Sequence, residues 1–464
     1  MNFIPAVFLG LLVFTAGTGR AEPGISQAAP DRLSLEQALA HALNHNFSIR
    51  RARERLREQE GIVTTMTAAA WPTVTATGNW QKTDVRRLLY PVTGQPGVPL
   101  LMPSGQFWRM TFTGSQTLFA GGGVQAAIAA ADLRREAAIF ELQATVNDTL
   151  LDVRTRFYAV LFAWAQINVQ EQNVRLLESQ LQDVIACLQA GKVSEFERLR
   201  AEVALASAKV PLIMARNHHR LAVEELRQAL GMEKTDDSAV GTSPDPIGTL
   251  TYLPLECDLR ATLAQARERR PELRRLAKLE AAAAAGEQIA WADLYPRLTM
   301  IGGGELRKGP TNRFNDSLTG LRAGLQAQTR VNLRATTGRV RQAESAAAQA
   351  RLAKEAEDLA VEVEVRQTVA ALEQAAELVT ATGKSVEQAE AAVRIAIVRF
   401  QSGISPQLDL LQSQVELTRA RTNQLQSVYA HNVAIARLRK AVGVPEIDFG
   451  AVAEAGLSAP TGPK

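Results

Sequence analysis

The sequence contains an internal duplication, which restricts the possible folds more than any other feature does. The segment Leu35–Leu39 recurs 224 residues further on as Leu259–Leu263. An aromatic-proline pair and three glycines also fall in register, at a shift of 224 or of 212 residues: Trp71-Pro72 with Tyr295-Pro296, Gly78 with Gly302, Gly191 with Gly403 and Gly231 with Gly443. Chance similarity between two alanine-rich helices does not align such residues, so we expect two copies of one structural unit.

Each copy shows the same predicted order of elements: a helix, a strand pair, a very long helix and a return helix. The first helices are predicted over 33–70 and 258–294, and each ends before its aromatic-proline pair because proline disfavours helix at the preceding residue. The long helices are predicted over 124–189 and 340–402. Each would be about 100 Å long, which exceeds the core of a globular domain.

The aligned glycines that follow the two long helices indicate hairpin tips, because another helical pattern begins at once after each. In the first copy, Ser194 and Glu197 can form a capping box. In the second, Ser405 can cap the return helix with Pro406 at the first helical position. Pro211 lies within the first return helix, where a kink and a break are both open interpretations.

Alternating residues predict two strands in each copy, within 72–118 and 296–330. The pattern is clear in the first copy and weaker in the second, with these apolar positions between polar ones: Val74, Ala76, Trp80, Trp108, Met110, Phe112, Leu298, Met300, Leu321, Ala323 and Leu325. Strands of this kind match bilayer-spanning strands with lipid on one face and water on the other. A half-buried sheet in a soluble domain is the alternative.

The number of strands bears on the assembly. Four strands cannot close a barrel, and open sheet edges are not tolerated in lipid, so the strands would have to close between chains. Eight strands enclose an interior that side chains fill, whereas twelve leave room for a pore. We therefore expect a mainly α fold with a small β part, in which a homotrimer forms a twelve-stranded transmembrane barrel and the long helices form a tube.

The N-terminal segment 1–21 has an apolar run followed by small residues, as in a secretory signal peptide, although it lacks an early Lys or Arg. The remaining chain divides into a first repeat over 22–231, a connecting segment over 232–256, a second repeat over 257–443 and a tail over 444–464. No later stretch of about 18 apolar residues occurs, so we expect any membrane crossing to be made by strands.

Other functional classes find little support in the sequence. The net charge of +4 is spread over mixed helical faces without a basic block, so a nucleic-acid partner is not expected. His41 and His45 have the spacing of metal ligands, but no third ligand is evident. Gly121-Gly122-Gly123 lacks the Lys-Ser/Thr of a phosphate-binding loop. No catalytic set has a suitable context, so we expect no enzyme, no cofactor and no metal site.

The combined motifs resemble the TolC-type outer-membrane efflux proteins over nearly the whole mature chain. The resemblance rests on the duplication, the Leu-x-x-Ala-Leu opening, the aromatic-proline pairs, Leu118–Gly122 before the long helix, and Gly403–Ser405 followed by Leu408–Leu411. It implies a trimer in the outer membrane of a Gram-negative bacterium, in contact with its lipid. The helical tube would extend into the periplasm, where an adaptor and an inner-membrane pump dock, and residues 232–256 and 444–464 would form a collar.

The resemblance also implies roles for residues at the helical tips. Asp409 falls at a position where the family narrows the tube with rings of Asp, Glu197 is its counterpart in the first copy, and Gln412 replaces a second Asp. A single solvated carboxylate is the alternative for Asp409. The gate-locking Tyr and Arg of the best-known member are replaced by Phe400 and Ser405. Adaptor docking is implied for Gly191, Lys192, Val193, Gly403, Ile404 and Ser405.

Two functional hypotheses from different classes follow. The first is an exit duct that serves either small-molecule efflux or type I protein secretion. The second is a periplasmic coiled-coil adaptor or scaffold, which would also have long helical hairpins. An adaptor would need no strands with a lipid-compatible face, and adaptors usually carry one hairpin instead of two, so the strands and the duplication favour the duct.

Overall fold

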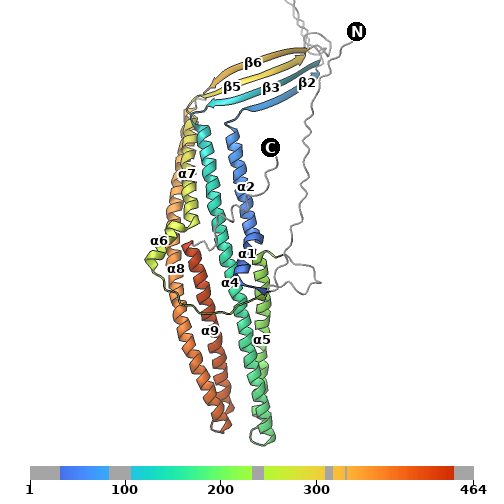
Figure 1. The fold of residues 1–464 in the computed structure, drawn as a ribbon, viewed down its shortest axis with the longest axis vertical. Helices are drawn as coiled ribbons and strands as arrows, with labels where there is room; N and C mark the ends of the chain where they lie inside the picture. Colours follow the sequence, from blue (N-terminus) through green and yellow to red (C-terminus); the bar gives the residue numbers. More distant parts are fainter. Residues whose placement is uncertain (1–31, 83–105, 233–244, 309–316, 330–331, 444–464) are drawn as a thin grey trace, which may run out of the picture.

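The computed structural model describes residues 32–82, 106–232, 245–308, 317–329 and 332–443. The molecule is elongated, with a four-stranded sheet at one end and two helical hairpin tips at the other (Figure 1). The predicted signal peptide 1–21 and tail 444–464 lie outside the described residues. The segments between the paired strands, 83–105 and 309–316, lie outside the described residues too.

Two very long helices run the length of the molecule, as the sequence predicts. Helix α4, Gly123–Gln189, has 67 residues, and α8, Leu333–Gln401, has 69. The start of α8 lies seven residues before the expected position 340, where Asn332 caps the helix by accepting a hydrogen bond from Ala335 N. The return helices are α5, Glu195–Leu230, and α9, Gln407–Val442. Helix α5 continues through Pro211.

The four strands form one antiparallel sheet in which the two repeats lie side by side. Strands β2, Thr73–Lys82, and β3, Gln106–Phe119, come from the first repeat. Strands β5, Arg297–Lys308, and β6, Ser317–Gln328, come from the second. The strand order is β2-β3-β5-β6, so β3 and β5 join the repeats and β2 and β6 are the outer strands of the sheet.

The prediction of unbroken helices over 33–70 and 258–294 is wrong. The first consists of α1, Leu35–His45, and α2, Phe47–Ala68, separated by Asn46 in an extended conformation. The second consists of α6, Leu259–Arg269, and α7, Pro271–Ala292, separated by Arg270. The break falls at equivalent positions, because the shift of 224 residues carries Asn46 onto Arg270.

A tertiary contact explains both breaks. The Asn46 side chain donates a hydrogen bond to the carbonyl oxygen of Ala229 at 2.6 Å, near the end of α5. Gly231, which ends α5 with a φ of +73°, lies so close that a Cβ there would be 2.5 Å from the carbonyl oxygen of His45. The end of the return helix α5 therefore packs directly against the backbone of the break between α1 and α2.

The core is built around these joints. In the first repeat, buried apolar residues of α1, α2, α4 and α5 form one cluster that includes Leu39, Ile49, Val153 and Leu226. In the second, α6, α7, α8 and α9 form a corresponding cluster, and a smaller third cluster joins α4 and α5 nearer the tips. Beside them, two short strands pair in parallel, β1 (Arg32–Leu33) with β4 (Asp245–Pro246). Burial is thus concentrated in the middle of the molecule, and both ends are left more open.

The triple glycine before α4 forms a strand-to-helix turn. Gly121 and Gly122 have φ values of +59° and +80°, which side chains other than glycine rarely adopt. A Cβ at Gly121 would also lie 2.8 Å from the carbonyl oxygen of Ala292, at the end of α7. The glycines thus allow the two repeats to meet closely where the helices enter the sheet.

Candidate membrane-spanning sheet and helical tips

One face of the sheet is continuously apolar across all four strands. The register pairs Ala76 with Phe112, Phe112 with Gly304, and Gly304 with Leu321, so these residues share a face. The same register adds the following residues to this face: Val74, Trp80, Trp108, Met110, Leu298, Met300, Leu306, Ala323, Leu325 and Ala327. Gln116 and Thr319 are polar exceptions within this face, and polar residues also end its strands far from the helices: Lys82, Gln106, Lys308 and Ser317. Many of these side chains are exposed in the single chain, and Leu321 reaches 94%.

The opposite face is mostly polar. Ile301, Leu318 and Phe107 are apolar exceptions on this face. Its other residues are mainly threonines, amides and charged residues: Thr73, Thr75, Thr77, Asn79, Gln81, Arg109, Thr111, Thr113, Ser115, Arg297, Thr299, Glu305, Arg307, Arg322, Gln326 and Gln328. A sheet that is apolar on one face and polar on the other suits lipid on the first and water on the second.

The dimensions of the sheet also suit a bilayer. Strand β2 has ten residues. At about 3.3 Å per residue it is about 33 Å long, and a tilt of about 40° reduces its height to about 25 Å, the height of the apolar band of membrane-spanning strands. Aromatic residues lie at both ends, with the cross-strand pair of exposed Trp80 and partly buried Trp108 far from the helices, and exposed Trp71 and Tyr295 next to them. Aromatic residues favour the two membrane interfaces.

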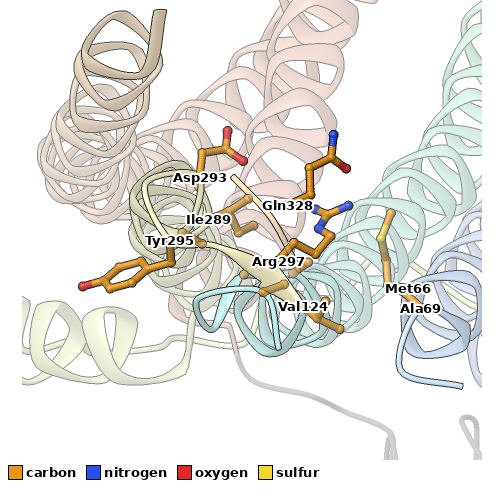
Figure 2. A pocket seen from close by; sticks show the side chains of 12 residues that line it. Met66, Ala69, Val124, Ile289, Asp293, Tyr295, Arg297 and Gln328 are labelled. Atoms are coloured by element: carbon orange, nitrogen blue, oxygen red, sulfur yellow. The ribbon is translucent and has the colours of Figure 1, made fainter. Parts of the chain in front are cut away.

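A cleft of about 340 Å³ lies where the helices meet the sheet (Figure 2). Met66 of α2, Val124 of α4 and Ile289 of α7 line it together with Arg297 at the start of β5. The ring of Tyr295 points away from the other labelled side chains, toward the outside of this junction (Figure 2). The junction thus brings both repeats together and presents one aromatic ring at the level where the strands begin.

The charged side chains on the polar face contact one another across strands. The Arg109 guanidinium lies 3.1 Å from a carboxylate oxygen of Glu305, and Arg307 approaches the same carboxylate at 4.0 Å. Arg322 of β6 donates a hydrogen bond to the Thr113 hydroxyl of β3 at 3.0 Å. Its side chain crosses β5 at Gly303, the residue that the register places between them.

The two helical tips have the same backbone turn. In the first, the backbone N–H of Lys192 donates to the carbonyl of Cys187 at 2.9 Å, and Gly191 has a φ of +70°. In the second, Ile404 donates to Arg399 at 2.9 Å, and Gly403 has a φ of +69°. This repeated geometry shows that the sequence signal at the tips, a glycine in the left-handed region, produces the same reversal twice.

The caps of the return helices differ from each other. The predicted capping box forms in the first copy, where the Glu197 carboxylate accepts a hydrogen bond from the backbone N–H of Ser194 at 3.2 Å. The prediction for the second copy is wrong by one residue, because Pro406 is the N-cap and α9 begins at Gln407. Proline already has the extended conformation of a cap, so Ser405 is left outside the helix.

A cleft of about 930 Å³ separates the two tips within one chain. It brings together six of the residues singled out from the sequence: Lys192, Val193 and Glu197 of the first tip, and Gly403, Ile404 and Ser405 of the second. Phe400 and Cys187 also line it. Asp409 and Gln412 do not line this cleft. Both are exposed on α9, three residues apart and therefore on neighbouring positions of one helix face.

Sequence reasoning missed a polar row buried along α9. Gln407 and Gln414 are each only 2% exposed, and neither side-chain amide has a hydrogen-bond partner within the described part of the chain. They alternate with Leu410 and Leu417 at the three- and four-residue spacing of a coiled-coil seam. This spacing can be read from the sequence. It was overlooked because glutamine usually marks the exposed face of a helix.

The described ranges contain neither a cluster of metal-ligating side chains nor a helix that could span a membrane. There, no three His, Cys, Asp or Glu side chains are grouped as metal ligands would be. His41 and His45 stack, with ring centroids 4.2 Å apart. No helix among the described residues combines the length and hydrophobicity needed to cross a bilayer.

Comparison with known proteins agrees with this architecture. The family model of outer membrane efflux proteins matches the chain twice, over residues 38–232 and 262–444. Nodulation protein T of Rhizobium leguminosarum bv. trifolii is 24% identical over 442 residues, which cover 91% of this chain and 87% of that protein. Protein CyaE of Bordetella pertussis is 24% identical over 298 residues, 63% of this chain and 60% of that protein.

Solved structures share the fold. The CmeC outer membrane channel of Campylobacter jejuni superimposes with a TM-score of 0.76 at 15% identity, covering 91% of this chain and 89% of that one. The open-state MtrE outer membrane channel of Neisseria gonorrhoeae gives a TM-score of 0.69 at 18% identity and covers 88% of each chain. At these identities the likeness concerns the fold alone.

Fold and sheet together define an internally duplicated, long-helix protein with a four-stranded amphipathic sheet. The chain belongs to the outer membrane efflux protein family, whose model matches both of its repeats. It is thus a Gram-negative outer-membrane protein that extends into the periplasm and acts as an exit channel. The family is one of transport channels and not of enzymes, and membership favours the duct over the periplasmic adaptor or scaffold.

Proposed function

We propose that three copies of this chain form the outer-membrane exit duct of a tripartite efflux or type I secretion system. The observation that carries the proposal is the amphipathic sheet, whose apolar face is continuous across β2, β3, β5 and β6. Substrate would leave an inner-membrane pump, pass through the helical tube and exit between the polar faces of the strands.

The trimer follows from the outer strands of the sheet. In lipid, the free backbone groups of β2 and β6 need partners, and the sheet is too small to close on itself. Pairing β2 of one chain with β6 of the next supplies those partners. Three chains then enclose twelve strands, whose interior is wide enough for water, whereas eight strands would be filled by side chains.

The tips are the proposed contact with a periplasmic adaptor. The cleft between them is lined by both hairpins, with Lys192 and Val193 on one side and Gly403, Ile404 and Ser405 on the other. Ile404 is 70% exposed, as expected of an apolar contact that a partner covers. Gly191 shapes this surface through its left-handed turn.

The proposed constriction is a ring of three Asp409 side chains. Asp409 is exposed in the first turn of α9, next to Gln412 on the same face. Three carboxylates around a symmetry axis concentrate cations. Glu197 is a weaker candidate for this ring, because its carboxylate caps α5 and lines the cleft between the tips.

Membrane fractionation combined with gel migration tests the proposed function. The protein should be found in the outer-membrane fraction and should migrate as a trimer in mild detergent until it is heated. A stable monomer in the soluble periplasmic fraction would contradict the proposal. As a matched pair, Leu321→Asp should prevent trimer insertion by placing charge on the apolar face, whereas Gln326→Asp, on the polar face of the same strand, should be tolerated.

A further inference from the structure

The polar face of the sheet carries a one-sided charge. The strands place four arginines and one glutamate on this face, which gives a net charge of +3 per chain: Arg109, Arg297, Arg307 and Arg322 against Glu305. The remaining charged residues of the strands, Lys82 and Lys308, belong by register to the other face, at the ends of their strands. The net charge of +3 on the polar face is therefore separate from the two lysines of the other face.

The arginines differ in how far their charge is neutralised. Arg109 and Arg307 share the carboxylate of Glu305, at 3.1 and 4.0 Å. Arg322 instead donates to the hydroxyl of Thr113, a neutral acceptor, at 3.0 Å. This bond holds the guanidinium over the middle of the sheet, at Gly303, which the register places between Arg322 and Thr113.

We propose that the strand end of the duct is an anion-attracting passage, built by Arg322 together with Arg109 and Arg307. The inference rests on the proposed function, since the polar face must line the lumen of a trimer, where the charge on the strands becomes +9 from three copies of +3. Rings of Arg or Lys favour anions in pores, and a low-dielectric wall strengthens the effect. The passage would favour solutes with carboxylate, sulfate or phosphate groups.

The opposite end of the duct has the opposite sign in this proposal. Asp409 at the tips would attract cations, whereas Arg322 at the strands would attract anions. A blocker added from the strand side therefore reports on the strand arginines without first passing Asp409. A blocker added from the tip side would pass the proposed Asp409 ring before it reaches the strands.

Planar bilayers containing the full-length protein provide the test, with inositol hexakisphosphate as the probe. The probe is added to the chamber that the strand end faces, and the concentration that halves the current is measured. Wild-type channels should be blocked. Arg322→Gln should raise the half-blocking concentration about tenfold, because it removes three charges from the ring. Arg322→Lys should restore the block.

Matched variants separate a local effect from a general one. Lys82→Gln removes a positive charge from the opposite face of the same sheet and should leave the block unchanged. If Arg322→Gln forms no channels, Arg109→Gln replaces it and should weaken the block in the same direction. Equal block of the wild type and both arginine variants would overturn the anion passage alone. Failure of the wild type to form trimers and channels would overturn the proposed function itself.

Discussion

Asn46 and Ala229 are joined by a hydrogen bond of 2.6 Å between the side-chain amide and the backbone carbonyl, across the break between α1 and α2. The second repeat makes the same joint with different chemistry, because the Arg270 Nε donates to the Ala441 carbonyl at 2.9 Å. Both pairs are related by the shifts found in the sequence, 224 residues for the donor and 212 for the acceptor. The duplication therefore extends to single hydrogen bonds.

Removing the first joint should destabilise the first repeat. Asn46→Ala leaves the carbonyl of Ala229 without its partner and removes the side-chain cap of α2, which together should cost about 1–3 kcal/mol. Thermal unfolding of the purified protein, followed by circular dichroism, measures the loss. Asn44→Ala is the control, because Asn44 is exposed two residues away and should change stability little. Equal effects of the two variants would show that the joint contributes nothing specific.

Two glycines with the same backbone conformation should respond differently to alanine. Gly231 and Gly191 have φ values of +73° and +70°, so either substitution costs about 1–2 kcal/mol from the left-handed conformation. At Gly231 the new Cβ would also lie 2.5 Å from the carbonyl oxygen of His45, whereas at Gly191 no atom lies within 4 Å. Gly231→Ala should therefore lower the melting temperature clearly more than Gly191→Ala. The reverse order would contradict the packing described for the break.

Replacing a buried glutamine of α9 by an apolar residue should increase the stability of the protein. Gln414→Leu keeps the volume of the side chain and removes two polar atoms that lack partners among the described residues, so we expect a gain of about 1–2 kcal/mol. Gln412→Leu, two residues away and exposed, is the control and should give no gain. Denaturant unfolding compares the two. Destabilisation by Gln414→Leu would mean that the buried amide forms a stabilising hydrogen bond in the assembled protein.

The acidic ring at the tips predicts a blocking phenotype. Trivalent cations such as hexaamminecobalt(III), added from the tip side of a planar bilayer, should block the wild type through the three Asp409 carboxylates. Asp409→Ala should reduce this block about tenfold or more. Glu416→Ala is a control, because it removes an exposed carboxylate two turns further along α9. If the Asp409→Ala channel were blocked as strongly as the wild type, the proposed Asp409 ring would be contradicted.

The sequence predicts those parts of the fold that local signals specify. Left-handed glycines end the long helices and alternating residues mark the strands, and the structure confirms both. The helix breaks were missed because Asn46 interrupts no periodic pattern, although asparagine is a common N-cap residue and here caps α2 by accepting hydrogen bonds from Ser48 N and Ile49 N. The packing of Gly231 against the break depends on residues far along the chain. A signal did exist in the second repeat, where Pro271 disfavours helix at Arg270. Carrying it back by 224 residues would have located the break at Asn46.

The candidate sites were predictable to a lesser degree. Gly191, Gly403 and their neighbours could be placed at the tips, since a helix end is a local feature. The meeting of both tips in one cleft depends on how α4 and α9 pack, which the sequence does not specify locally. Likewise, the alternation that puts Met110 and Leu321 on the apolar face puts their neighbours Arg109 and Arg322 on the polar face. Their contacts with Glu305 and Thr113 depend on the register between strands of different repeats.

Spin labels on two neighbouring residues of β6 test whether the sheet spans the membrane, with lipid on one face and water on the other. Leu325→Cys lies on the apolar face and Gln326→Cys on the polar face, each in a background with Cys187→Ser and Cys257→Ser and reconstituted in lipid vesicles. The label at position 325 should collide mainly with oxygen dissolved in lipid, because this face of the sheet contacts lipid in the proposed duct. The label at position 326 should collide mainly with a water-soluble nickel chelate. If both labels were equally accessible to the chelate, the sheet would not be the membrane-spanning part of a duct.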